Sequence, residues 1–214
     1  GQDCELCWTI PDLGGQPVAS IGVAIASQKR ASGTLYLDWL TWSGAPQVRL
    51  GRPAAGGKMW SKAWVNAVSE YGHRYPEAYR LMQNHGTGML IQGTRDWQDY
   101  TVSAEITPHM AQSTGLAARV QGLERYYALL VTAGGKAQLI KALDGQSVLA
   151  ETDFAFTWGE AIRFKLRVKG PHITASLNGR DLFEFSDTAR PLLDGAVALV
   201  IEEGRMACEE VSIE

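Results

Sequence analysis

Hydrophobic and polar residues alternate along much of the chain in short runs, and each run ends at Gly, Pro or a small polar cluster. The clearest run covers residues 97–106, and two similar runs follow at 115–121 and 125–131. Alternation of this kind places successive side chains on opposite faces of a strand. From residue 79 onward the pattern therefore predicts antiparallel strands near 79–83, 88–93, 98–107, 114–121, 125–132, 136–143, 147–151, 161–169, 171–177, 181–185, 195–201 and 206–213.

Two turn sequences add to this prediction. Asn178-Gly179 and Asp144-Gly145 each separate two apolar runs, and both residue pairs tolerate the positive φ angles that tight hairpin turns require. The strands are not interleaved with helical patterns, which argues against a βαβ fold. The sequence therefore predicts an all-β protein built as a two-sheet β-sandwich.

The first 78 residues have a different pattern. An apolar run at 17–26, a polar turn at 28–33 and an alternating run at 34–42 predict an extra N-terminal β-hairpin, which would need a packing partner because isolated hairpins are marginally stable. Gly and Pro residues between 43 and 57 indicate a linker. Trp60, Trp64 and Val68 are spaced by four, which fits either one amphipathic helix of about three turns or an irregular segment that holds two Trp rings against a sheet. We expect a division into 1–50, 51–78 and 79–214.

Composition excludes several classes of function. The chain has 214 residues, enough for a sizeable core, and a formal net charge of −3 without a basic stripe, so we expect no nucleic-acid partner. No apolar run reaches the roughly 18–20 residues of a membrane helix, so we expect no membrane partner. Cys4, Cys7 and Cys208 are too few for a four-ligand zinc site or a disulfide framework, and we expect them to be reduced, as in a cytoplasmic protein.

Short sequences in the second part of the chain carry a family resemblance. In order they are Trp97-x-Asp-Tyr100, Gly115-Leu-Ala-Ala-Arg119, Tyr126-Tyr127, Lys141-Ala-Leu-Asp-Gly145, Lys165-Leu-Arg-Val-Lys-Gly170, Leu177-Asn-Gly-Arg180, Asp194-Gly-Ala-Val-Ala198 and Glu209-Glu-Val211. This order resembles a concanavalin A-like, laminin-G-like jelly roll and is similar to 3-keto-disaccharide hydrolase-like domains and family 66 carbohydrate-binding modules. The whole chain also resembles the C-terminal region of bacterial ADP-ribosylglycohydrolase-family proteins.

The resemblance implies a jelly-roll sandwich over 79–214 and an upstream hydrolase domain as partner. It also implies that residues 1–50 are the closing strands of an upstream galactose-binding-like jelly roll. The acidic metal-ligand motifs and helix-rich body of an ADP-ribosylglycohydrolase catalytic domain are absent from this sequence. We therefore do not expect this chain alone to hydrolyse ADP-ribose.

Sugar recognition needs aromatic faces for the apolar side of a ring and planar polar groups for paired hydroxyls. On this basis we expect Tyr127 and Trp158 to stack on a carbohydrate, and Arg119, Gln121 and Lys141 to contact its hydroxyl or anionic groups. The alternative is that the aromatic residues belong to the core and rim, and that Arg119 is solvated or paired internally.

Asp38 and Glu209 occupy the resembling positions in the two closing strands, where modules of this type often hold a structural Ca²⁺. Glycoside cleavage is less favoured, because the adjacent acidic pairs, Glu202-Glu203 and Glu209-Glu210, would point to opposite faces of a strand. We expect a non-catalytic carbohydrate-binding accessory module of a larger bacterial protein. A glycoside-cleaving enzyme and a purely structural or oligomerisation domain remain as alternatives.

Overall fold

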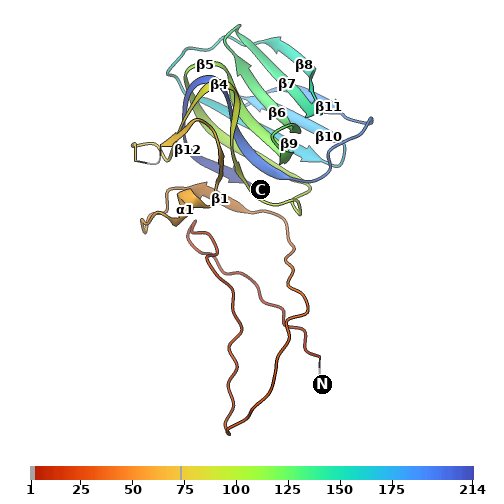
Figure 1. Cartoon of the computed structure of the whole chain (residues 1–214). Helices are drawn as coiled ribbons and strands as arrows, with labels where there is room; N and C mark the ends of the chain where they lie inside the picture. Colours follow the sequence, from red (N-terminus) through yellow and green to blue (C-terminus); the bar gives the residue numbers. More distant parts are fainter. Residues whose placement is uncertain (1–2, 73) are drawn as a thin grey trace.

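The protein is almost entirely β-structure. A computed structural model describes residues 3–72 and 74–214. Its elements in chain order are β1 (Val48–Gly51), α1 (Met59–Lys62), β2 (Val65–Ala67), β3 (Glu70–Gly72), β4 (Tyr79–Gln92), β5 (Tyr100–Gly122), β6 (Arg125–Thr132), β7 (Lys136–Leu143), β8 (Gln146–Asp153), β9 (Ile162–Lys169), β10 (His172–Leu177), β11 (Arg180–Ser186) and β12 (Ala196–Ile213). The predicted all-β class is confirmed (Figure 1).

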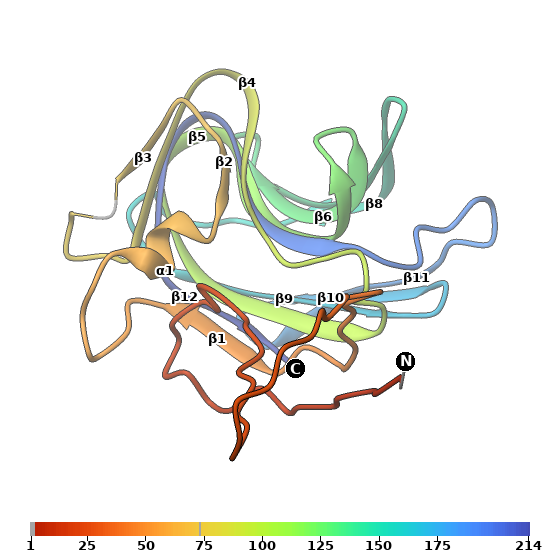
Figure 2. The ribbon, with the colours of Figure 1, turned by 60° about the horizontal axis from the view of Figure 1, so that its bottom comes forward.

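The strands form two layers that share three long strands. The first layer contains β11, β10 and β9, then the N-terminal part of β5 and the C-terminal part of β12, and finally β1, the start of β4 and β3. The second layer contains β8, β7, β6 and the remaining parts of β5, β12 and β4, with β2 at the edge. Since β4, β5 and β12 run from one layer into the other, hydrogen bonding is continuous through the sandwich (Figure 2).

These three strands bend together where they leave the first layer. The β4–β12 register shifts between Glu202 and Gly204, opposite residues 84–86 of β4. A Cβ atom on Gly204 would lie 1.9 Å from the carbonyl oxygen of Met110, so only glycine permits the close approach of β12 to β5 at this bend. The sequence predicted separate strands on either side of these positions, but the chain instead continues through bulges that turn the strands without ending them.

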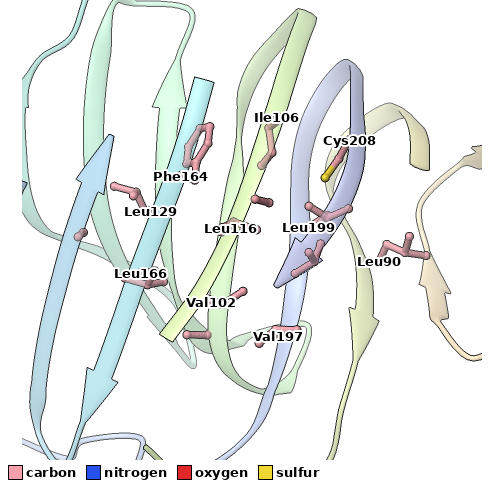
Figure 3. Packing of buried hydrophobic residues seen from close by; sticks show 14 of the residues in the cluster. Leu90, Val102, Ile106, Leu116, Leu129, Phe164, Leu166, Val197, Leu199 and Cys208 are labelled. Carbon is pink, nitrogen blue, oxygen red and sulfur yellow. The ribbon is translucent and has the colours of Figure 1, made fainter. Parts of the chain in front are cut away.

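Alternating side chains fill the space between the layers. Every second residue of β9 is buried, beginning with Ile162 and Phe164, and these rings and aliphatic chains meet residues such as Leu116, Leu129 and Leu199 (Figure 3). Each such side chain contributes about 1.5–3 kcal/mol when removed from water. A second buried cluster occupies the opposite face of the second layer and consists of Met89, Ala117, Val120, Tyr126, Ala128, Leu130, Ile140, Ala142, Ala196, Ala198 and Val200.

Both predicted two-residue hairpins are confirmed. Residues 178–179 join β10 to β11 with φ angles of 51° and 78°, and residues 144–145 join β7 to β8 with φ angles of 54° and 133°. Positive φ at both turn positions matches the twist of the flanking strands.

The segment between 51 and 78 belongs to the sandwich rather than being a linker. β2 and β3 both pair with β4, and α1 is a single turn of four residues. The rings of Trp60 and Trp64 lie edge-to-face against Tyr79, with centroids 5.7 and 5.0 Å apart. The second interpretation of the Trp spacing is therefore the correct one, since packing against the sheet fixes the rings without a long helix.

The expected N-terminal hairpin is not formed. Residues 3–47 contain no helix or strand and extend away from the sandwich (Figure 1). Fourteen of the twenty-two exposed large hydrophobic residues of the described chain lie in this arm, among them Leu35, Leu37 and Trp39. The alternating pattern is present, but the described chain offers these side chains no second layer to pack against, and a hairpin without one is marginal in water.

Candidate functional site

A bulge in β5 turns Arg119 into the interior. The β5–β6 register is interrupted after Ala118, and Arg119 has a φ of 52°, in the left-handed region. Its backbone N–H donates a 2.6 Å hydrogen bond to the Tyr100 hydroxyl oxygen, which fixes the bulge. In a regular strand Arg119 and Gln121 would lie on one face, because they are two residues apart. The bulge removes that relation, because it adds residues that have no partner on β6.

The Arg119 side chain acts as an internal clamp. It is wholly buried, and its guanidinium donates to the carbonyl oxygens of Gln98 (3.2 Å), Gly170 and Leu192 (2.6 Å) and to Asp99 (3.2 Å). Burial lowers the pKa of Arg119, and the charges of Tyr100 and Asp99 are the largest effects that oppose it. Full burial argues against the expected direct contact with a ligand and agrees with the alternative of internal pairing.

Tyr127 and Lys141 hold the 187–195 loop, which joins β11 to β12. The Tyr127 hydroxyl donates to Asp187 Oδ2 (2.6 Å) and accepts from the Leu192 N–H (3.0 Å). Lys141 Nζ donates to the same carboxylate oxygen and to the carbonyl oxygens of Ala189 (3.2 Å) and Arg190 (2.7 Å). Burial alone would raise the pKa of Asp187, but hydrogen bonds from Lys141 and Tyr127 hold it below its usual value.

These contacts correct two further expectations. Tyr127 is the core-facing member of the Tyr126–Tyr127 pair and has no exposed surface, so no sugar ring can reach its face. Lys141 is buried with its ammonium group fully engaged, which leaves no donor directed outward. Sequence reasoning missed their common partner Asp187, because strand alternation gives no information about a carboxylate in a distant loop.

Polar groups from β5 and from the segment before β5 meet the outer side of the 187–195 loop at Asp194. Gln121 of β5 is half-buried, and its Nε2 donates to both the carbonyl oxygen and the side chain of Asp194 (3.0 Å each). Arg95 Nε also donates to Asp194 (3.3 Å), and its side chain is 71% exposed.

A second set of exposed charged side chains, centred on Asp144, lies at the same end of the sandwich. The Asp144 carboxylate lies 3.2 Å from Arg125 and 3.9 Å from Arg190. Five non-glycine residues of the described chain have positive φ. Apart from the hairpin turn residues Asp144 and Asn178 these are Arg119, Arg190 and Glu203, and the first two of these lie at this end. Strained backbone of this kind gathers at functional sites more often than elsewhere. We therefore treat this end of the sandwich as the candidate site.

Trp158 lies apart from the other predicted residues. It is 40% exposed, and its ring packs edge-to-face on Phe156 with centroids 4.9 Å apart. The neighbouring Gly159 N–H donates to the Pro108 carbonyl oxygen at the bend of β5. Trp158 thus remains accessible to a ligand, but no contact links it to the 187–195 loop among the residues described.

The two carboxylates expected as Ca²⁺ ligands, Asp38 and Glu209, lie in different surroundings. Asp38 is exposed on the arm, and Glu209 Oε2 accepts a hydrogen bond from the Ala78 N–H (3.3 Å). Within residues 3–72 and 74–214, no group of three or more His, Cys, Asp or Glu side chains is arranged to hold a metal ion. A Ca²⁺ ion also takes backbone carbonyl oxygens and water as ligands, so a structural Ca²⁺ at Asp38 or Glu209 stays a prediction.

A hollow of about 410 Å³ beside β1 brings two carboxylates together. Its lining includes Asp12 and Glu210, together with Arg49 and Arg52. Glycoside cleavage needs two carboxyl groups held at a defined separation of about 5–10 Å. Asp12 lies on the arm, where no helix or strand fixes its position, so this hollow does not favour catalysis.

Comparisons with known proteins identify the fold. No family model matches the chain, and no curated protein matches it. The family 66 carbohydrate-binding module from Bacillus subtilis superposes with a TM-score of 0.64 at 17% identity, over 71% of this chain and 95% of that one. A Bacillus subtilis protein of unknown function with a galectin-like fold gives 0.61 at 15% identity, over 81% and 97%.

A third structure, a putative glycosyl hydrolase from Parabacteroides distasonis, gives a TM-score of 0.51 at 14% identity, over 72% of this chain and 88% of that one. At these identities the similarity establishes the architecture alone. The chain has the jelly-roll β-sandwich fold of galectin-like proteins and carbohydrate-binding modules. No described helix has the length and apolar character that crossing a membrane requires.

Proposed function

We propose that the chain is a non-catalytic carbohydrate-binding module that serves a larger protein. The observation that carries this proposal is the buried network of Arg119, Tyr127, Lys141 and Asp187, which fixes the 187–195 loop from within. A loop held in this way presents its exposed groups in one geometry, and preorganised polar groups bind with less loss of entropy. The sandwich fold agrees with this role.

The proposed contacts are the half-exposed and exposed planar groups above that network. The Arg190 guanidinium can donate two parallel hydrogen bonds, the Asp194 carboxylate can accept two, and the Gln121 carbonyl oxygen can accept one while its NH₂ group holds Asp194. These groups suit neighbouring hydroxyls of a sugar. Trp158 keeps its proposed stacking role at a separate position. The resemblance to ADP-ribosylglycohydrolase-family proteins supports an upstream hydrolase domain as the partner that this module would direct to its target.

Binding to a broad glycan array that includes ADP-ribose-related ligands tests the proposal. Arg190→Ala should weaken binding of any ligand found by tenfold or more. Arg180→Ala is the matched control, because it removes an exposed arginine at the other end of the β11 strand. A blank array, repeated with added Ca²⁺, would refute the proposal. Substitution of Arg119 or Tyr127 is a poor test, since it would also disturb the fold.

A structural or oligomerisation role is the second candidate, and the arm is the observation that favours it. Fourteen large hydrophobic side chains are exposed between Leu6 and Trp42. Exposed apolar surface on this scale marks an interaction with another domain or protein. We propose that, if the glycan array is blank, the arm completes a neighbouring sandwich domain, as the resemblance of residues 1–50 to closing jelly-roll strands implies.

A further inference from the structure

The outward face of the first layer carries a polar cluster with an exposed aromatic ring, and none of its residues takes part in the site described above. Arg80 lies between Tyr79 and Leu81 on β4, both of which are completely buried in the core. Strand alternation therefore directs Arg80 to the outer face. In the register Arg80 pairs with Ala207 of β12, which in turn pairs with Thr107 of β5.

The small side chain of Ala207 separates polar groups on the two flanking strands. Arg80 stands on one side of it, and His109, two residues beyond Thr107, stands on the other. Glu77 belongs to this cluster, because Arg80 Nη2 lies 2.9 Å from Glu77 Oε1 and His109 also interacts electrostatically with the Glu77 carboxyl group.

Tyr75 covers one edge of the cluster and is held in place from two directions. The Arg80 guanidinium lies 4.5 Å from the centroid of its ring. A Cβ atom at Gly72 would lie 2.5 Å from Tyr75 Cε2, so glycine at position 72 makes room for the ring. Arg52 Nη2 donates to the carbonyl oxygens of Tyr75 (2.7 Å) and Glu77 (3.2 Å) and ties the same segment to the end of β1. The ring is 41% exposed.

The cluster is incomplete in the free chain. Glu77 Oε2, Arg80 Nε and His109 Nε2 are buried, and none of them has a hydrogen-bond partner among the residues described. Polar atoms in such positions normally have a protein, water or ligand partner, and leaving one unsatisfied is unfavourable. The side chains themselves remain within reach of solvent, since about a third of Arg80 and a quarter of Glu77 are exposed.

We propose that this cluster is a second carbohydrate-contact surface, in which a sugar ring stacks on the exposed part of Tyr75 and its hydroxyl groups bond to the partly exposed side chains of Glu77, Arg80 and His109, which turn their buried, unpaired atoms toward the ligand. The ligand class is a neutral saccharide with neighbouring hydroxyls. Glu77 accepts hydrogen bonds, Arg80 donates them, and the imidazole of His109 does either. The combination of one exposed aromatic face and several planar polar groups is what sugar rings require. This inference rests on the proposed carbohydrate-binding function.

The test measures binding of a saccharide identified on the glycan array to the full chain by isothermal titration calorimetry. Tyr75→Ala and His109→Ala should each raise the Kd at least tenfold, and Tyr75→Phe should keep the wild-type affinity because the ring is retained. The matched controls are Tyr36→Ala, which removes an exposed tyrosine ring of the arm, and His85→Ala, which removes a histidine whose side chain is 96% exposed. Melting temperatures confirm that each variant is folded.

The outcomes separate this inference from the function on which it rests. Loss of affinity in Tyr75→Ala and His109→Ala, with both controls unchanged, supports the second surface. Unchanged affinity in these two variants, together with loss in Arg190→Ala, overturns the inference and leaves the proposed function standing. An array without any binding saccharide refutes both.

Discussion

Replacement of Arg119 by methionine is the sharpest test of the buried network. Methionine fills most of the volume of the arginine stem but has no donor, so the carbonyl groups of Gln98, Gly170 and Leu192 and the carboxylate of Asp99 all lose a hydrogen bond. The Arg119 side chain is completely buried, so water cannot replace the lost contacts without opening the structure.

The expected magnitude follows from these contacts. An unsatisfied buried acceptor costs about 1–3 kcal/mol. Asp99 is 55% exposed and regains solvent, so it adds little. Part of the cost at the three carbonyl groups is offset because a buried charge no longer has to be desolvated. We expect the free energy of unfolding to fall by about 3–5 kcal/mol, a large share of the roughly 5–15 kcal/mol that stabilises a domain.

Urea unfolding followed by tryptophan fluorescence measures this loss, since the chain contains seven Trp residues. The matched control is Arg163→Met, which removes an arginine from an exposed ion pair with Glu105 whose side chains are 79% and 54% exposed. The control should change the free energy of unfolding by less than about 1 kcal/mol. A loss below about 1 kcal/mol for Arg119→Met would refute the clamp and return Arg119 to consideration as a ligand contact.

Two other predictions concern the cysteines and the arm. Burial raises the pKa of the Cys208 thiol to about 12, whereas the thiol of the unfolded chain ionises near 9. The folded state therefore holds this proton more tightly, and stability should be unaffected below pH 9 and should decline as the pH rises from about 9 to about 12. In the native protein a thiol reagent should modify Cys4 and Cys7, which are exposed, and should reach Cys208 only in denaturant; prompt reaction of all three would contradict the burial. Deletion of residues 3–44 should change the free energy of unfolding by less than about 1 kcal/mol in the same urea assay, because the main core contains no arm residue, and it should reduce binding of a hydrophobic dye. A large loss of stability would mean that the arm is part of the folding unit.

Strand positions could be predicted from the sequence because local chemistry decides them. β9 buries every second residue, as its alternation indicates, and the turns at 144–145 and 178–179 have the residues that positive φ requires. The bends of β4, β5 and β12 were predicted as strand ends. In β4 and β12 a glycine at a bulge and a glycine at a turn look the same in a single sequence, and in β5 the alternating run is interrupted at Pro108. The difference depends on pairing with strands far away in the chain.

The site was less predictable for a related reason. The alternation correctly sends one of Tyr126 and Tyr127 into the core, but it does not say which of the two. The inward turn of Arg119 depends on a bulge, and its partners come from residues 98, 99, 170 and 192. In the arm the prediction failed for a different reason. The alternating sequence of a hairpin is present, but no strand forms, because the described chain provides no surface against which the hairpin could pack.

The position of β12 has a consequence for synthesis in the cell. β12 is the last strand of the sandwich in sequence order, yet it lies in the middle of the sheet, between β4 and β5. While the ribosome is still making residues 196–213, both neighbours have completed their own sequences but have an unpaired edge facing each other. Such edges pair readily with strands of other molecules, so the nascent chain is open to aggregation until its final strand is inserted. A chain interrupted before β12 would lack the strand that joins the β5 side of the sheet to the β4 side. We expect such a chain to be degraded by proteases or to accumulate in insoluble form.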